Sequence, residues 1–482
     1  MNDGKRLRLF DSVLLAVTVI LTVESVAPAA SVGPTQFFWW ALLLIAFFLP
    51  YGMISAELGT TYKDEGGLYD WVKRAYGPRN GGRVAWYYWI NFPLWMGSLA
   101  VLFPTVINQV AGHTMGMLPS TIISLLFVWV VIFISLFRIA DSKWILNIAA
   151  IFKVIIILSL GGLGIYVAAT HGVANTFTAK TMLPSMNLNS LSFVSVIIFN
   201  FLGFEVVAAM SGSMKNPQRE IPKAILLGGV LIAVFYLLAA FGIGTAIPYS
   251  KLTTDSGLLD SFSTLLGSGG TWFVTIVGLM FLYTLGSNLL SWSYGVNYVA
   301  MYASENSSLP KIFSWKNART EMPIGAPILN GVVASILVLL DPLMQKLGMD
   351  NIFWNFFALN VVTFLASYIF MFPSFLKLRK TDPHRERPFK VKANNGWLAV
   401  MTYVPVILLI ASIFCTVVPF SLSSDELSSK LPLLIGTIIA VIVGEIIVHV
   451  SLRQHHDDDR VLPTVDVNGS SLSSSGKGDA KL

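Results

Sequence analysis

The sequence predicts an all-α polytopic membrane protein of about twelve transmembrane helices. Of the 482 residues, 55% are hydrophobic and only 12% are charged, whereas a soluble globular domain carries about 25% charged residues. Apolar stretches of about twenty residues recur along the chain, and each is long enough to cross the hydrocarbon core as a helix. Lys and Arg also divide very unevenly between alternate loops, as they do in membrane proteins of fixed orientation.

The candidate spans follow one another with short polar connections. The first begins just after Lys5, Arg6 and Arg8 and superficially resembles a signal peptide. No cleavage pattern followed by a soluble domain comes after it, so we expect it to be retained as a span. The ninth is short, and the eighth is long enough to tilt or to project beyond the bilayer. The spans lie near residues 10–31, 36–61, 84–110, 119–137, 144–169, 191–211, 224–248, 270–303, 326–341, 350–374, 397–420 and 431–452.

The loop charges predict that both termini are cytoplasmic. With the N-terminus and every second loop taken as one side, 27 of the 32 Lys and Arg residues lie on that side. Four lie on the other side (Lys180, Lys251, Lys346 and Lys430), and Lys153 lies inside the fifth span. With a different number of spans, the Lys and Arg residues would be distributed over both sides of the membrane.

The spans divide the chain into five parts. Residues 1–9 form a cytoplasmic N-terminus, 10–211 hold spans one to six, 212–374 hold spans seven to ten, and 397–452 hold spans eleven and twelve. Residues 453–482 are rich in His, Asp, Ser and Gly, so we expect a disordered cytoplasmic tail. The alternative is a tail that closes the cytoplasmic vestibule in a pH-dependent way.

Composition and motifs exclude several other classes of protein. The single cysteine, Cys415, allows no disulfide within the chain and no thiolate metal cluster. The six histidines are scattered, and no glycine-rich phosphate loop is present, so we expect no enzyme activity, no cofactor, no metal site and no ATP-driven pumping. The net charge of +6 resides in the loops of one side, which indicates a membrane topology and not a nucleic-acid partner.

Two spans carry an acidic side chain next to a helix-breaking residue. Glu24 lies four residues before Pro28 in span one, and Glu205 follows Gly203 in span six. Spans one and six stand five apart, as do the paired broken helices that hold the substrate in inverted-repeat transporters. Because an intramembrane charge is costly, we expect both carboxylates to be functional, although a structural role as satisfied charges in kinked helices is the alternative.

Other polar and aromatic residues in the spans are more ambiguous. Lys153 lies about 15 Å into span five and is either a counter-ion to a glutamate or a titrating coupling group. We expect Glu57 and Glu445, near cytoplasmic span ends, to be structural. The aromatic residues of span eight are expected to pack, with Trp292 as the exception. In span three, Trp89 and Asn91 are weak candidates for pore-lining residues.

Four loop motifs resemble the amino acid–polyamine–organocation family of transporters, and the resemblance covers about residues 8–452. Residues 65–78 read EGGLYDWVKRAYGP after span two, and residues 215–222 read KNPQREIP after span six. Residues 308–313 read SLPKIF after span eight, and residues 387–391 read RPFKV after span ten. The resemblance implies alternating access, in a LeuT-like fold of two inverted five-helix repeats plus two further helices.

The resemblance also implies roles for individual residues. Trp292 lies 18 positions before Pro310, where related antiporters carry a substrate-side tryptophan, and Phe199 lies where they place a gating aromatic. Trp292 is expected to gate as well as to bind. Glu205 corresponds to an acidic residue linked to proton sensing. Lys153 resembles the lysine that some sodium-independent relatives use in place of sodium.

One departure from the family pattern points to the substrate. Amino-acid carriers of this family usually have a Gly-Ser-Gly-like break in span one, but here the stretch is Leu21 to Ser25, with Glu24 and no glycine. A substrate carboxylate would meet like charge there, whereas a cationic amine would meet Glu24, Glu205, carbonyl oxygens and the aromatic faces of Phe201 and Trp292. The expected substrate contacts are Glu24, Ser25, Ala27, Asn200, Phe201, Glu205 and Trp292.

The pattern is therefore similar to that of bacterial agmatine–putrescine exchangers in the inner membrane. We expect small cationic amines and the lipid bilayer as partners, and a homodimer is left open. The alternatives are an amino-acid permease or amino acid/amine exchanger of the same family, a membrane-embedded enzyme or receptor, and a passive channel. Uptake of a carboxylate-bearing substrate, ATP hydrolysis, or conductance without counter-substrate would distinguish them.

Overall fold

The protein is helical throughout the part of the chain that the structure describes. The computed structural model describes residues 13, 19–62, 66–137, 139–184, 191–205, 217–346 and 351–461. Within these ranges the extended pairing is limited to one isolated bridge between Lys316 and Pro323, in a loop. These observations confirm the predicted all-α class. The physical reason is that a separate segment inside a bilayer can satisfy all its backbone amides only as a helix.

Ten helical segments in these ranges are long and apolar enough to cross a membrane. Several consist of consecutive helices that are joined end to end. The segments are α3 (Gln36–Leu43) with η2 (Leu44–Phe48) and α4 (Leu49–Thr61); α6 (Pro78–Ala111); α7 (Met117–Ser135); α8 (Ile139–Thr170); α13 (Pro217–Ala246); α14 (Gly257–Leu266) with η5 (Gly267–Gly270) and α15 (Thr271–Glu305); α16 (Gly325–Lys346); α17 (Ile352–Tyr368) with α18 (Met371–Thr381); α19 (Asn395–Val417); and α20 (Ser424–Val461).

The two remaining predicted spans, the first and the sixth, are interrupted. The short helix α2 (Val26–Ala30) follows the break in span one, and α11 (Val194–Phe199) precedes the break in span six. Short connecting helices are α5 (Gly67–Tyr76), α9 (Ala179–Met182), η4 (Tyr249–Lys251) and η6 (Lys311–Ser314). Ten continuous segments and two broken ones agree with about twelve spans.

Some boundaries differ from those predicted. The ninth span is not short, because α16 continues to Lys346 beyond the predicted end at 341. The tenth divides into α17 and α18 at a turn after Tyr368. Helix α20 extends to Val461 and therefore includes the first residues of the predicted polar tail. Residues 1–9 and 462–482 lie outside the described residues.

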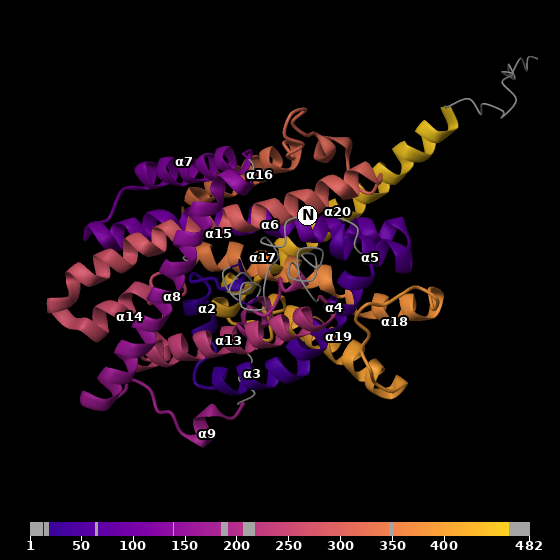
Figure 1. The fold of residues 1–482 in the computed structure, drawn as a ribbon. Helices are drawn as coiled ribbons and strands as arrows, with labels where there is room; N and C mark the ends of the chain where they lie inside the picture. Colours follow the sequence, from indigo (N-terminus) through magenta and orange to yellow (C-terminus); the bar gives the residue numbers. More distant parts are fainter. Residues whose placement is uncertain are drawn as a thin grey trace, which may run out of the picture.

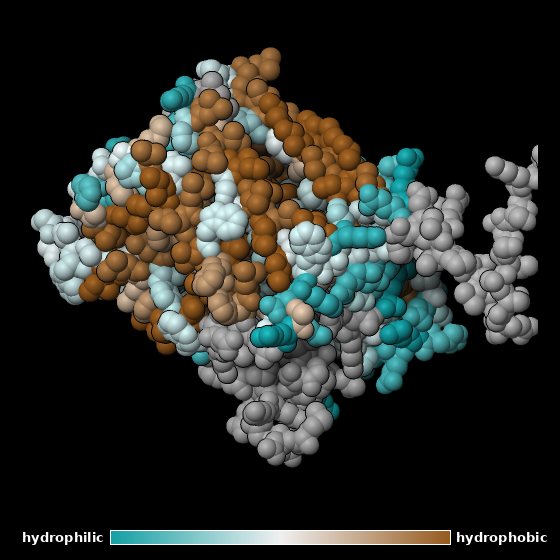
Figure 2. Space-filling view, turned by 90° about the horizontal axis from the view of Figure 1, so that it is seen from above, coloured by the Kyte–Doolittle hydropathy of each residue, from teal (hydrophilic) through white to brown (hydrophobic). Residues whose placement is uncertain are grey.

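The helices form an elongated bundle with chemically different ends. Figure 1 shows α5, α18 and the end of α20 at one end of the bundle, and α14 with the adjoining end of α8 at the other. Helix α6 packs against both α15 and α17 in the interior. Figure 2 shows hydrophobic surface across the middle of the molecule and hydrophilic residues gathered at the end that carries α5 and α18. We call this the basic end, after Lys73, Arg74, Arg79, Arg379 and Arg387.

The family-like loop motifs meet one another at the basic end. The Tyr69 hydroxyl lies 2.9 Å from Ser308 Oγ, and Lys73 Nζ donates to Asn306 Oδ1 at 2.7 Å. These contacts join the loop after span two to the loop after span eight.

Glu57 lies in a buried ion cluster at the same end. Arg379 donates to both of its carboxylate oxygens, at 2.8 and 2.5 Å, and Arg387 Nε lies 3.4 Å from Oε1. The backbone amide of Val391 donates to Oε2 at 2.7 Å, which fixes the RPFKV motif over the end of α4. Glu445 pairs with Arg83 and Arg79 nearer to the surface. Both glutamates therefore have the structural role predicted for them.

Replacing Glu57 with Gln should destabilise the protein far more than the same change at Glu445. The Glu57 side chain is 2% exposed and its two arginines are 15% and 7% exposed, so the change leaves guanidinium groups buried without a counter-charge. Breaking a buried pair costs about 3–5 kcal/mol, whereas the half-exposed Glu445 cluster should lose about 1 kcal/mol or less. Thermal unfolding of the two variants in detergent, followed by tryptophan fluorescence, measures the difference. Equal melting temperatures would contradict this assignment.

Candidate functional site

The backbone of span one is open at Glu24. The helical turn at Val19–Ile20 ends at Leu21, and regular helix resumes at Val26, so Leu21–Ser25 form the break. Pro28 lies inside α2, after the break and not within it. Span six opens between Asn200 and Phe204, after α11 has ended at Phe199.

A buried group of hydroxyls and one amide connects the two breaks. Ser25 Oγ donates to Asn200 Oδ1 at 2.9 Å, and Thr22 Oγ1 donates to the same oxygen at 3.2 Å. The hydroxyl of Tyr236, on α13, lies 2.9 Å from the Thr22 carbonyl oxygen and 3.1 Å from Asn200 Oδ1. The breaks of spans one and six therefore lie next to each other, with α13 as the third member of the junction.

Glycine is required at position 203 for two reasons. Its φ of +101° belongs to the region that L-residues with a side chain rarely adopt. A Cβ atom there would also lie 2.7 Å from the indole ring of Trp292. The absence of a side chain at Gly203 therefore leaves room for the indole ring of Trp292.

Glu24 points into the interior and has partners from three other helices. The side-chain amide of Asn288, on α15, donates to both carboxylate oxygens, at 3.1 and 2.9 Å. Lys153, on α8, and Trp95, on α6, are also near enough to act electrostatically on the Glu24 carboxylate. Glu24 and Lys153 are each 2% exposed, so the opposite charges are buried together. The counter-ion role and the coupling role of Lys153 both stay predictions.

An aromatic box lies over the same region and consists of Trp95, Phe199, Trp292 and Phe364. The Trp292 ring centroid lies 5.5 Å from that of Phe364 and 6.2 Å from that of Trp95, with nearly perpendicular planes. Phe199 lies 5.6 Å from Phe364 and 6.3 Å from Trp95. The two predicted gating residues, Phe199 and Trp292, thus belong to one cluster, and Trp292 Nε1 donates to the Val19 carbonyl at 3.1 Å.

Glu205 lies in a different environment, enclosed by three tyrosines. Tyr368 donates to Oε1 at 2.7 Å and Tyr88 to the same oxygen at 3.3 Å, while Tyr51 donates to Oε2. The Tyr51 hydroxyl also accepts from the backbone amide of Gly203 at 3.0 Å. These phenols come from α17, α6 and α4. The Glu205 carboxylate therefore connects span six, just after its break, to three other helices through hydrogen bonds.

Other residues predicted to touch the substrate have structural partners here. Ser25 and Asn200 belong to the junction between the breaks. Phe201 packs against Trp40 and Phe48, at ring distances of 5.0 and 5.2 Å. Ala27 faces α14, since a Cβ at Gly257 would lie 3.5 Å from its methyl group. Their contact with a substrate stays a prediction.

The weak candidates of span three lie among packing residues. Trp89 packs edge-on against Phe313, at a ring distance of 4.7 Å. The Asn91 amide donates to the Tyr88 carbonyl, at 2.5 Å, within its own helix.

The structure adds residues that the sequence did not single out. Asn288, Trp95 and Phe364 join Glu24 and Trp292 from three separate helices. Asn288 precedes Trp292 by four residues, so helical spacing places both on one face of the helix. This spacing could have identified Asn288 as a site candidate from the sequence. Trp95 and Phe364 are single members of aromatic-rich spans, and no local signal distinguishes them from packing residues.

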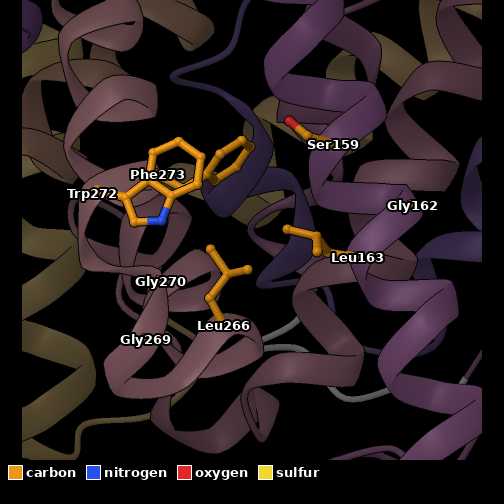
Figure 3. A pocket seen from close by; sticks show the side chains of 8 residues that line it. All are labelled: Ser159, Gly162, Leu163, Leu266, Gly269, Gly270, Trp272 and Phe273. Atoms are coloured by element: carbon orange, nitrogen blue, oxygen red, sulfur yellow. The ribbon is translucent and has the colours of Figure 1, made fainter.

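Two other cavities are poorly suited to a cation. Figure 3 shows a cavity of about 470 Å³ between α8, η5 and the start of α15, where Ser159 is the polar side chain among mainly apolar and glycine neighbours. Its hydroxyl donates to a carbonyl of its own helix. A cavity of about 790 Å³ between α6, α16, α17 and α20 is lined mainly by apolar side chains. Neither has an acidic lining residue, so neither supplies a counter-charge.

The Glu24 region has chemical features that favour an organic cation. It offers a buried carboxylate, aromatic ring faces and the open backbone of two broken helices, which together favour positive charge in a low dielectric. These features define a broken-helix membrane carrier.

The chain belongs to the amino acid permease family, which its sequence matches over residues 7–443. It is 48% identical over 454 residues to the probable agmatine/putrescine antiporter AguD of Lactococcus lactis subsp. lactis (strain IL1403), covering 94% of this chain and 97% of that protein. It is 22% identical to a glutamate/gamma-aminobutyrate antiporter of the same organism, over 95% and 93% of the two chains. It is 24% identical to a probable polyamine transporter of Arabidopsis thaliana, over 81% and 74%. The family predicted from the loop motifs is confirmed.

Replacing Gly203 with Ala should destabilise the protein and displace Trp292. The left-handed backbone costs about 1–2 kcal/mol for a residue with a side chain, and the clash with the indole adds to this cost. Gly295→Ala is the matched control, because a Cβ there meets no atom within 4 Å and alanine favours the helix. Thermal unfolding should therefore separate the two variants, and a Gly203→Ala protein that melts with the Gly295→Ala protein would contradict this account.

Proposed function

We propose that this protein is a secondary active transporter that exchanges cationic amines by alternating access, with agmatine entering and putrescine leaving. The observation that carries the proposal is the buried Glu24 carboxylate in the break of span one, held by Asn288 and faced by aromatic rings. The proposed location is a bacterial inner membrane, with the basic end and both termini in the cytoplasm.

The chemistry of the site favours an amine over an amino acid. Glu24 places negative charge where a substrate carboxylate would otherwise meet free backbone amides, and like charges repel strongly in a buried site. Agmatine and putrescine carry positive charge at each end and no carboxylate. The cation–π attraction of Trp292 and Trp95 adds to the charge pairing with Glu24. The 48% identity to the probable agmatine/putrescine antiporter of Lactococcus lactis supports the same substrate pair.

One observation favours the amino-acid alternative. Lys153 lies close enough to Glu24 for their charges to interact, so a zwitterion could place its ammonium group at Glu24 and its carboxylate near Lys153. The identity to the glutamate/gamma-aminobutyrate antiporter is, however, only 22%. Competition by arginine, which shares the guanidinium group of agmatine but adds a carboxylate, distinguishes the two candidates.

The two candidate coupling groups have different roles in this proposal. Lys153 acts as an internal counter-ion that occupies Glu24 when no substrate is bound and is displaced by the arriving amine. Glu205 already accepts hydrogen bonds from three phenols, which leaves it less suited to bind substrate. It remains the candidate group for coupling to protons. Phe199 and Trp292 are proposed to cover the bound amine.

Counterflow in proteoliposomes tests the proposed function. Vesicles loaded with putrescine should accumulate labelled agmatine, and empty vesicles should not. Glu24→Gln should lower this uptake at least about thirtyfold, because losing a buried charge pairing costs about 2–5 kcal/mol. Glu445→Gln is the control, since that residue lies in the ion cluster at the basic end. Undiminished uptake by the Glu24→Gln protein, or uptake of arginine in preference to agmatine, would refute the assignment.

The coupling roles predict distinct kinetics for two variants. Lys153→Met removes the internal competitor, so the half-saturating agmatine concentration should fall about fivefold, or about 1 kcal/mol, and the maximal rate should fall because release slows. Glu205→Gln should leave that concentration nearly unchanged, because three phenols already donate to this carboxylate. Initial rates measured over a range of agmatine concentrations test both roles. A higher half-saturating concentration in Lys153→Met or in Glu205→Gln would contradict the respective role.

A further inference from the structure

The cavity of about 790 Å³ between α6, α16, α17 and α20 has the form of a groove, which we call the apolar groove. Helices α6 and α17 pack against each other, while α16 packs against α6 and α20 packs against both. Lining residues of the two inner helices, such as Trp89 and Phe356, are buried, whereas Leu340 on α16 and Ile439 on α20 are exposed. The inner helices therefore form the floor of the groove, and α16 and α20 form its edges.

The apolar groove is long enough for a lipid acyl chain. Its lining extends from Leu329 to Met344 on α16 and from Pro432 to Ile447 on α20, a separation of 15 residues on each helix. At about 1.5 Å per residue this is about 22 Å. One leaflet of a hydrocarbon core of about 30 Å is about 15 Å thick, so the groove exceeds the depth of one leaflet. The medium around α16 and α20 consists of such chains, because both helices cross the membrane.

One end of the apolar groove contains a buried amide without a partner. Asn355, near the start of α17, lines the groove and is only 6% exposed. Its Oδ1 forms no hydrogen bond with the described protein atoms. Turning the amide over would place an N–H group at the same buried position, so either orientation leaves one polar atom unsatisfied. Such an atom is costly and uncommon in native proteins, and it is expected where a ligand supplies the partner.

The same end of the groove carries charges of both signs on α16. Because α17 follows α16 directly in the chain, Asn355 lies at the end where α16 finishes, opposite to the basic end. Lys346 is exposed in the last turn of α16, and Asp341, which follows the lining residue Leu340, is half-buried. A zwitterionic headgroup also carries both signs. An ethanolamine headgroup has N–H donors for an amide oxygen and phosphate oxygens for an amide nitrogen, whereas a choline headgroup has no N–H donor.

We propose that the apolar groove binds one phospholipid with an amine headgroup, of the phosphatidylethanolamine type, from the leaflet opposite to the basic end. One acyl chain lies along the groove, and the headgroup reaches the amide of Asn355. Helical spacing directs Trp89 and Trp95 to different sides of α6, and Leu359 and Phe364 to different sides of α17. The lipid therefore supports both helices from behind the aromatic box. The site is separate from the Glu24 region and does not depend on the proposed transport activity.

Native mass spectrometry of the full chain in detergent tests the inference. The protein is exposed to equal amounts of phosphatidylethanolamine and phosphatidylcholine with identical acyl chains. Both lipids are zwitterionic, and only the first has N–H donors. The unmodified protein should retain one phosphatidylethanolamine, in about fivefold excess over phosphatidylcholine, which corresponds to one hydrogen bond. Equal retention of the two lipids, or retention of neither, would overturn the inference.

Two neighbouring valines of α16 provide a matched pair of variants. Val333 lines the groove, so Val333→Trp should fill it and abolish retention of the lipid. Val332 is exposed and is not among the lining residues, so Val332→Trp should retain the lipid. Asn355→Leu has a similar size and should still retain a lipid, but without preference between the two headgroups.

Two results with these variants would also overturn the inference. The first is equal retention by Val333→Trp and Val332→Trp, because the lipid would then lie elsewhere. The second is an unchanged preference for phosphatidylethanolamine in Asn355→Leu, because the amide would then make no contact with the headgroup. If Val333→Trp does not fold, the comparison of the two lipids on the unmodified protein still decides.

Discussion

The interior of this carrier is organised around the cost of burying the charge of Glu24. A carboxylate far from water is tolerated only where an opposite charge and hydrogen-bond donors surround it. Lys153 supplies the charge, Asn288 supplies two donors, and the open turn of span one brings further backbone groups close. These partners come from α8 and α15, which must therefore stay in register with the broken helix. Removing any one of them leaves the others with an uncompensated polar group.

The second buried carboxylate shows how differently the same side chain can be used. Among the described residues, the side chains that donate hydrogen bonds to Glu205 are three tyrosines from three helices, and the backbone amide of its neighbour Gly203 donates to one of them, Tyr51. Because the three donors belong to different helices, a relative movement of these helices would change the hydrogen bonds of Glu205. Glu24 instead has the charge of Lys153 nearby. The two buried glutamates thus differ in their surroundings, because one interacts with a cationic side chain and the other with neutral donors.

The general plan was predictable because its signals are local. Glu24 next to an irregular stretch of an apolar span, the Gly203–Glu205 pair and the loop motifs each appear within a few residues of sequence. The assignments of Ser25 and Asn200 were less informative, because a buried hydroxyl or amide in a break can satisfy the protein itself as readily as a ligand. Trp95, Phe364 and the tyrosines around Glu205 become neighbours only when separate spans pack together. That arrangement has no signature along the chain.

The location of Glu24 and Lys153 in the protein has a consequence for the bioenergetics of the proposed exchange. Neither side chain is carried across the bilayer with the amine. Agmatine and putrescine each carry about two positive charges near neutral pH, since guanidinium and primary ammonium groups both titrate far above it. One-for-one exchange then moves no net charge across the bilayer. The membrane potential, worth about 2.3 kcal/mol per elementary charge at 100 mV, neither drives nor opposes such a cycle. If no proton moves with the amines in the proposed exchange, its direction follows from the two concentration ratios, and a cell that consumes the incoming amine and produces the outgoing one sustains the flux without drawing on its membrane potential.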